Sequence, residues 1–161
     1  MPAEVRKLLF CSDLSENSNV ALRYAALLAK LTGADMHVLH VVEELSTDAK
    51  VTIQGFLMDA AKRNEALNER VRNIRSEVLK QQDAFWSQQS PDDQKVRKQV
   101  RSIDVIESYP AEQILRTSVK LGCDLIVMGA HEKGLSHTFL GGVAKSVLRR
   151  SRVPTLIVPM P

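Results

Sequence analysis

Short apolar runs alternate with longer amphipathic stretches along most of this chain. Runs of four to seven mostly apolar residues, bounded by polar residues, Gly or Pro, are typical of strands buried on both faces of a parallel sheet. Five runs of this kind predict strands at 8–11, 36–42, 103–106 (within 100–107), 125–128 and 155–158.

Helices are predicted between these strands from their start and stop signals. Asp13 or Ser15 is a candidate N-cap for the first helix, and Gly33 suits its end. Pro is favoured in the first turn of a helix and Gly just after the last turn, because each suits the backbone required at its position. The other two helices predicted in this way cover 110–121 and run from 141–142 to about 150.

The segment 43–99 has a different pattern. Its apolar side chains recur at intervals of three, four and seven, which predicts one long amphipathic helix over about 55–84. We interpret this stripe as core or as a face for a partner helix, and the polar segment 86–94 as a surface loop. The residues of the stripe are Leu57, Ala60, Leu67, Val71, Ile74 and Val78.

Alternation of strands and helices predicts an α/β fold with a parallel sheet covered by helices on both faces. We expect one domain over 1–161, with an extended helix and loop insertion around 45–98. Ligands of such sheets bind beyond the carboxyl ends of the strands, where the strand order reverses. This rule nominates Ser12, Asp13, Val41 and the segment 129–144.

Composition narrows the function classes. The chain is 44% apolar and 25% charged, as in a folded globular protein. Its net charge is +3, and no aromatic residue lies within its basic clusters, so nucleic-acid binding is weakly supported. No apolar run is long enough to span a membrane, and the first residues do not resemble an export signal. We therefore expect a cytoplasmic protein without a membrane partner.

The residues that most often carry chemistry do not form a catalytic pattern. Cys11 and Cys123 lie beside apolar runs, which predicts buried free thiols in a reducing compartment. His37 and His40 are three residues apart on one predicted strand and should point to opposite faces. No metal site or catalytic constellation is recognisable. The sequence thus favours a binding protein over an enzyme, with slow hydrolysis of a bound ligand left open.

Three glycines mark a candidate phosphate cradle. Gly129 directly follows a predicted strand, and Gly141 and Gly142 precede a predicted helix. Glycine lets the backbone approach a ligand closely, and the free amides at a helix start attract phosphate. The spacing matches neither the G-x-x-x-x-G-K-[ST] nor the G-x-G-x-x-G loop. A purely structural role for these glycines remains the alternative.

Five ordered motifs resemble those of the universal stress protein family in its single-domain form. The strongest is CDLIVMGAH at 123–131; the others are KLLFCSDLS at 7–15, LHVV at 39–42, YPAEQIL at 109–115 and RSRVPTLIV at 150–158. The resemblance covers nearly the whole chain outside 45–98. It implies an open five-stranded parallel sheet of Rossmann-like type with strand order 3-2-1-4-5, and a homodimer formed through the C-terminal strand.

The resemblance also implies ATP or ADP as ligand, with Mg²⁺ as an accompanying ion. ATP-binding relatives carry G-x-x-G, about nine residues and then Gly with Ser or Thr. Gly129 fits the first glycine, but Glu132 stands where the second is expected. Gly141 and Gly142 take the last two positions if one loop residue is missing; otherwise Gly142 and Val143 take them. Either register lacks the hydroxyl.

The two departures weaken the predicted site without removing it. The Glu132 carboxylate would repel a triphosphate unless it turned to solvent or a divalent cation bridged the two. The missing hydroxyl removes one hydrogen bond, worth about 0.5–1.5 kcal/mol net. Lys133 and Lys145 offer compensating cations.

The nucleotide site implied by the resemblance includes positions with plain structural alternatives. Asp13 could act only as a helix cap, Val41 only as a core residue, and His131 could simply be exposed. The full predicted set is Cys11, Ser12, Asp13, Val41, Met128, Gly129, His131, Glu132, Lys133, Gly141, Gly142, Val143 and Ala144.

The expected function is therefore a stress-response protein that binds adenine nucleotide at the carboxyl ends of the first and fourth strands and acts as a nucleotide-dependent signalling module. An unidentified protein partner would receive the signal. The alternative is a dimeric interaction module with a degenerate pocket, acting through its long helix.

Overall fold

The computed structural model describes residues 3–56, 59–130 and 140–161. Its five strands form one sheet in the order β3-β2-β1-β4-β5, and every neighbouring pair is parallel. The predicted fold class and strand order are confirmed. The strands are β1 (Lys7–Ser12), β2 (Asp35–Glu43), β3 (Val100–Ser108), β4 (Leu125–Gly129) and β5 (Thr155–Val158).

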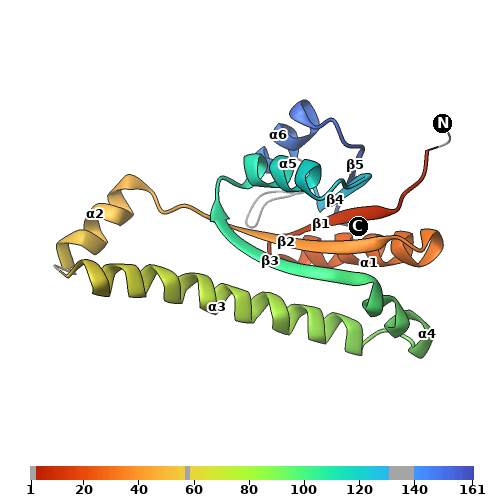
Figure 1. Cartoon of the computed structure of the whole chain (residues 1–161), viewed down its shortest axis with the longest axis horizontal. Helices are drawn as coiled ribbons and strands as arrows, with labels where there is room; N and C mark the ends of the chain where they lie inside the picture. The colour runs from red at the N-terminus through yellow and green to blue at the C-terminus, as the bar shows by residue number, and fades with distance from the viewer. Residues whose placement is uncertain (1–2, 57–58, 131–139) are drawn as a thin grey trace.

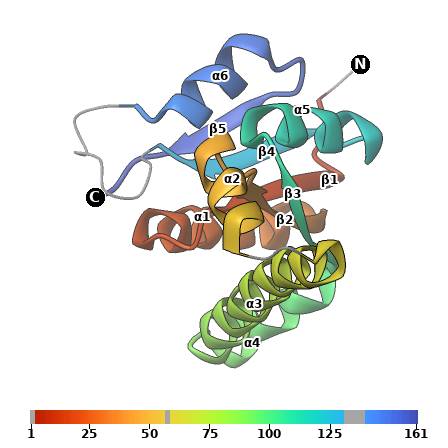
Figure 2. The ribbon, with the colours of Figure 1, turned by 90° about the vertical axis from the view of Figure 1, so that its left-hand side faces the viewer.

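Helices cover both faces of this sheet. Figure 1 shows α1 and α3 below the sheet and α5 and α6 above it, and Figure 2 shows the same two layers from the side. The helices are α1 (Glu16–Thr32), α2 (Thr47–Phe56), α3 (Ala60–Ser87), α4 (Pro91–Gln94), the 3-10 helix η1 (Lys95–Gln99), α5 (Pro110–Lys120) and α6 (Gly142–Arg150). None of the helices within the described ranges could cross a membrane.

Alternate side chains of each central strand build two separate cores. On β1, Leu8 and Phe10 belong to the core cluster that α1 and the end of α3 cover. Leu9 and Cys11 belong to the second cluster, which includes α5 and α6. A strand with apolar residues at every position can supply both cores, because successive side chains point to opposite faces. This explains why the strands are continuous apolar runs.

The first helix begins and ends at sequence-encoded caps. Ser15 is the N-cap, since its side chain accepts a hydrogen bond from the Ser18 N–H at 3.1 Å. Gly33 is the C-cap with φ 71°, a left-handed conformation that glycine adopts without steric cost. Of the two predicted N-caps, Ser15 is the residue used.

The predicted long helix over about 55–84 is largely confirmed, since α3 covers 60–87, but it starts later than predicted. Residues 55 and 56 belong to α2, and α3 begins after Asp59, whose carboxylate accepts a hydrogen bond from the Ala61 N–H at 2.9 Å. Along the predicted stripe, Val78 is fully buried, whereas Leu67 is half-buried and Ala60 is exposed. Leu57 lies outside the described residues. The start was misplaced because the apolar period alone does not register the Asp59 cap at the beginning of α3.

The prediction of a surface loop over 86–94 is wrong at both ends, because both ends lie in helices. Trp86 closes α3 and is only 2% exposed, and its ring meets Phe85 edge-on with the ring centroids 4.9 Å apart. Residues 91–94 form α4, where Ser90 caps the Asp93 N–H. A large apolar ring lowers the free energy when it is buried, even within a polar stretch of sequence.

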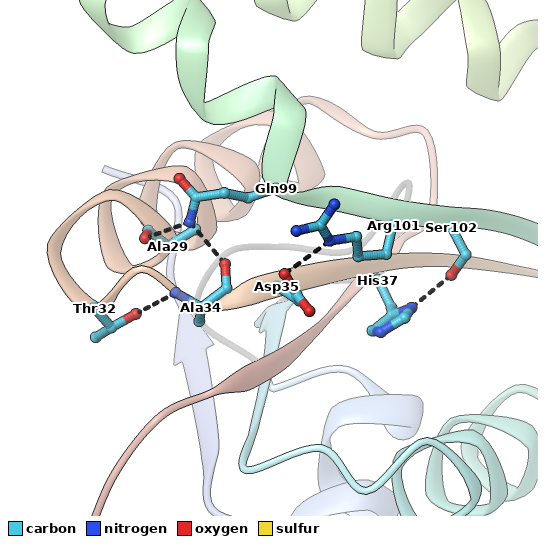
Figure 3. A network of polar contacts seen from close by, with 8 residues as sticks. All are labelled: Ala29, Thr32, Ala34, Asp35, His37, Gln99, Arg101 and Ser102. Carbon is cyan, nitrogen blue, oxygen red and sulfur yellow. Dashed lines mark hydrogen bonds and ion pairs between the residues drawn. The ribbon is translucent and has the colours of Figure 1, made fainter.

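Side-chain contacts join the edge strand β3 to its neighbours (Figure 3). The Gln99 amide donates to the carbonyls of Ala29 and Ala34, both at 2.7 Å, and so links η1 to the end of α1. Arg101 pairs with Asp35 at 2.8 Å, at the start of β2. Further along, the His37 ring contacts the Ser102 hydroxyl at 2.7 Å.

Both cysteines are buried free thiols, as predicted. Burial raises the pKa of the Cys123 thiol to about 11 and raises that of Cys11 as well. Both are therefore protonated at neutral pH, and neither is an activated nucleophile. Among the described residues, no group of His, Cys, Asp and Glu side chains is placed to hold a metal ion.

Candidate functional site

A cavity of about 320 Å³ opens at the carboxyl ends of β1, β2 and β4. The first turns of α5 and α6 contribute Pro110 and Ile114 on one side and Gly141, Val143 and Ala144 on the other. The chain winds outward from β1 in both directions, so this is the point where the strand order reverses. Small-molecule sites of α/β sheets lie at such points and have cavities of this size.

The structure brings most of the predicted site residues together at this cavity. Gly142 is the first residue of α6 but does not line it. His131, Glu132 and Lys133 lie outside the described residues, so their roles stay predictions. The predicted residues that line the cavity are Cys11, Ser12, Asp13, Val41, Met128, Gly129, Gly141, Val143 and Ala144.

Other lining residues were missed. The opening of α5 was predicted, but the strand pattern does not say that this helix start meets the ends of β1 and β4. On β2, the sequence nominated only Val41, although Leu39, His40 and Glu43 also line the cavity. The missed residues are Leu39, His40, Glu43, Pro110 and Ile114; Ala130, which also lines the cavity, lies within the nominated segment 129–144.

The start of α6 is suited to an anion. Its N-cap, Gly141, has no side chain to cap the helix, and its N–H donates to Ala130 O at 2.8 Å. The first bond within the helix runs from Lys145 N–H to Gly141 O at 3.0 Å. The first amides of a helix have no acceptor within it, and they carry the positive end of the helix dipole. An anion in the cavity would meet this helix end.

Gly129 has a packing reason to be glycine. A Cβ atom there would lie 2.6 Å from Asn17 Oδ1. Asn17 is buried, and its amide donates to Val158 O at 3.0 Å, which ties α1 to the edge strand β5. The structural alternative for this glycine therefore holds whether or not a ligand binds.

Asp13 supports the loop between β1 and α1. Its Oδ1 accepts a hydrogen bond from the Ser15 N–H at 2.9 Å, and the side chain of Ser15 then caps α1. Between them, Leu14 has φ 65°, a conformation that residues other than glycine rarely adopt. Asp13 also lines the cavity, so the helix-start role and a ligand role are compatible in one side chain.

His40 is a buried histidine at the edge of the cavity. It is 7% exposed, and its Nδ1 has no hydrogen-bond partner among the described residues. Burial lowers its pKa; a hydrogen bond to the backbone of Ser12 and the carboxylates of Asp13 and Glu77 oppose this shift. The imidazole is therefore neutral at neutral pH.

His40 should make the protein less stable in acid. Its pKa in the folded protein lies below the ordinary 6.5, so unfolding takes up a proton once the pH falls below about that value. The free energy of unfolding should then fall more steeply between about pH 7 and about pH 5 in the natural protein than in His40→Gln. Urea unfolding at several pH values measures the difference. Equal slopes for the two proteins would contradict the assignment.

The long helix α3 contacts two residues that line the cavity. The Ser12 hydroxyl donates to Gln81 Oε1 at 3.1 Å, and the Gln81 amide donates to Asn19 at 2.9 Å. At the last residue of β2, the Arg70 guanidinium donates to Glu43 O at 2.9 Å. These hydrogen bonds directly connect α3 with residues that line the cavity.

A family model described as the universal stress protein family matches residues 4–159. The chain belongs to the universal stress protein family. Universal stress protein MJ0577 of Methanocaldococcus jannaschii is 26% identical over 159 residues, covering 98% of this chain and 97% of the relative. Universal stress protein G of Shigella flexneri is 27% identical over 143 residues, covering 89% of each chain.

Solved structures share the fold of this universal stress protein. The structure of protein MJ0577 has a TM-score of 0.71 at 23% identity, covering 98% of this chain and 97% of the other. A universal stress protein in complex with cAMP has a TM-score of 0.53 at 16% identity, covering 97% and 98%. One from Archaeoglobus fulgidus in complex with dAMP has a TM-score of 0.52 at 16% identity, covering 98% and 99%.

Proposed function

We propose that this universal stress protein binds an adenine nucleotide, ATP or ADP, in the cavity at the carboxyl ends of β1 and β4, and that nucleotide occupancy sets its signalling state. The observation that carries the proposal is the start of α6, with glycine as its N-cap, at a cavity lined by Asp13, Val41 and Gly129. Two family structures hold cAMP and dAMP, both adenine nucleotides, which supports the ligand class.

The cavity offers a place for each part of a nucleotide. Amides of the first turn of α6 would receive a phosphate, as helix starts do. Apolar side chains of Leu39, Val41 and Ile114 would lie against the base. Asp13 would accept a hydrogen bond from a ribose hydroxyl.

Charge at the cavity favours a nucleotide that carries a cation. Among the described lining residues, the charged side chains are Asp13 and Glu43, and both are acidic. His40 is neutral and supplies no balancing charge. Mg²⁺ bound to the phosphates would reduce repulsion by these carboxylates and by Glu132. Binding should therefore be tighter with Mg²⁺ than with a chelator.

Signalling would use α3. Its Gln81 and Arg70 contact Ser12 and Glu43 at the cavity, so ligand-driven movement of either residue would reach the helix directly. We also propose a cytoplasmic homodimer joined through β5, an edge strand that has apolar residues between Pro154 and Pro159. No catalytic step is assigned.

Calorimetric titration with ATP and Mg²⁺ tests the proposal. We expect a Kd below about 100 μM, equivalent to about −5.5 kcal/mol. No heat at millimolar ATP, ADP or AMP would contradict it and favour the second candidate, an interaction module acting through α3. The contacts of α3 with the cavity and the acid at position 132 are the observations that favour this alternative.

A charge variant separates a weakened site from a missing one. Glu132→Gly should tighten ATP binding if the carboxylate repels phosphate, whereas Glu65→Gln, a charge change on exposed α3, should leave the affinity unchanged. Unchanged affinity for Glu132→Gly would show that charge repulsion does not limit binding.

A further inference from the structure

A second hollow lies between the first half of α3 and the end of β3. Its volume is about 820 Å³, and it shares no lining residue with the nucleotide cavity. Figure 1 shows α3 running beneath β3 and diverging from it towards α2. We call it the α3–β3 groove; it is lined by Asn64, Leu67, Asn68, Val71, Arg72, Val105, Ile106 and Glu107.

One wall of the groove is a single helix face. Asn64, Leu67, Asn68 and Val71 are spaced by three, four and seven residues, so they lie side by side along α3. Leu67 and Val71 are half-buried and apolar, and the two asparagines are exposed beside them, one helical turn apart. This wall can receive apolar side chains and can also hydrogen-bond to a neighbouring backbone.

The other wall is a free sheet edge. In the order β3-β2-β1-β4-β5, β3 pairs only with β2. Arg75 donates to Ile103 O at 3.2 Å and so covers the edge before the groove begins. Alternate residues of a strand present their N–H and C=O groups on the same edge, so Val105 and Glu107 present theirs beside Ile103. No hydrogen bond to the outer backbone of these two residues is found within the described ranges.

We propose that the α3–β3 groove binds an extended segment of a partner protein, which adds as a sixth strand to the edge of β3. The free edge favours a strand as occupant, because one extended segment can pair with the outer N–H and C=O groups of both Val105 and Glu107. Alternate side chains of that strand would point at Leu67 and Val71. Arg72, whose contact with Glu69 is exposed and 3.9 Å long, favours an acidic residue at its end of the segment.

Nuclear magnetic resonance on the ¹⁵N-labelled full chain tests this proposal. The probes are four acetylated, amidated decapeptides with Val, Ile, Leu or Tyr at alternate positions, and Thr plus one Glu between them. At least one should cause saturable shifts at the amides of Val105 and Glu107 and slow their hydrogen exchange. The amide of Met128, at the nucleotide cavity, should not respond, so this outcome does not depend on the proposed function.

Peptide methylation distinguishes strand addition from apolar adsorption. Methyl groups on one alternating set of peptide nitrogens should weaken binding by about tenfold or more, because those N–H groups bond to β3. Methyl groups on the other set should have little effect. Equal effects of the two sets, or no saturable shift with any of the four peptides, would overturn the proposal.

A protein variant locates the site on α3. Leu67→Asp should weaken the peptide by about tenfold or more, whereas Leu79→Asp, at a residue that is 39% exposed on the same helix, should not. The methylated peptides keep the test decisive if Leu67→Asp fails to fold. A change of the protein's own oligomeric mass with Leu67→Asp and no peptide would instead make the groove an interface between copies and overturn the proposal.

Discussion

Trp86→Ala should lower the free energy of unfolding by about 3–5 kcal/mol, the usual cost of removing a buried large aromatic side chain. Trp86 is 2% exposed in the core beneath the sheet and packs edge-on against Phe85. Its Nε1 donates to Gln82 Oε1 at 3.1 Å. Gln82 is fully buried, and its Nε2 has no partner in the described part of the chain.

Loss of the indole would leave the whole Gln82 amide unpaired inside the protein, which adds to the cost of the cavity. Urea unfolding followed by far-ultraviolet circular dichroism measures the change, because the chain has one tryptophan and the variant lacks its fluorescence. Leu79→Ala, at a 39% exposed position of the same helix, should cost about 0.5 kcal/mol or less. A loss below about 1 kcal/mol for Trp86→Ala would contradict the packing described for α3.

Gly129→Ala should destabilise the protein by about 1–3 kcal/mol, because its Cβ would meet Asn17 and displace a buried hydrogen bond. The methyl carbon would lie 2.6 Å from Asn17 Oδ1, closer than packed atoms come. Movement of the Asn17 side chain away from the new methyl group would disturb its 3.0 Å bond to Val158 O, an oxygen that also accepts from the Ala130 N–H at 2.9 Å. The link between α1 and β5 would weaken at the same time.

A double-mutant cycle tests the cause. In an Asn17→Ala background the clash is gone, so Gly129→Ala should cost much less there than in the natural chain. Gly55→Ala is the matched control: it lies in α2 with nothing within 4 Å of its Cβ position, so alanine should be neutral or slightly stabilising. Equal costs of Gly129→Ala in both backgrounds would exclude Asn17 as the origin.

Agreement between sequence and structure is closest where a signal is local. Ser15 and Gly33 terminate α1 as their residue types predict, because a cap needs only a few neighbouring backbone groups. The five strands follow from apolar runs that must face two cores. The errors in 55–94 have a different origin: the apolar period does not register the Asp59 cap that sets the start of α3, and Trp86 is buried by elements distant in sequence.

The predictions for the candidate site succeeded and failed for the same reasons. Residues at the carboxyl ends of β1 and β4, such as Ser12 and Gly129, were found because the carboxyl ends of parallel strands meet at one edge. Pro110, Ile114 and Glu43 were not, because their nearness to the cavity depends on how α5 crosses the sheet and how far β2 extends. The free edge of β3 beside α3 likewise has no signature in the chain.

The amino-acid sequence by itself determined the positions of the five strands, the caps of α1, the parallel sheet and the family, because these depend on side-chain period, backbone preference and ordered motifs. Only the tertiary structure decided that Asn17 excludes a side chain at Gly129, that His40 is buried with no partner for Nδ1 in the part of the chain the structure describes, and that α3 reaches the cavity through Gln81. Such contacts join residues far apart in the chain, and their energies depend on distances that no local pattern encodes.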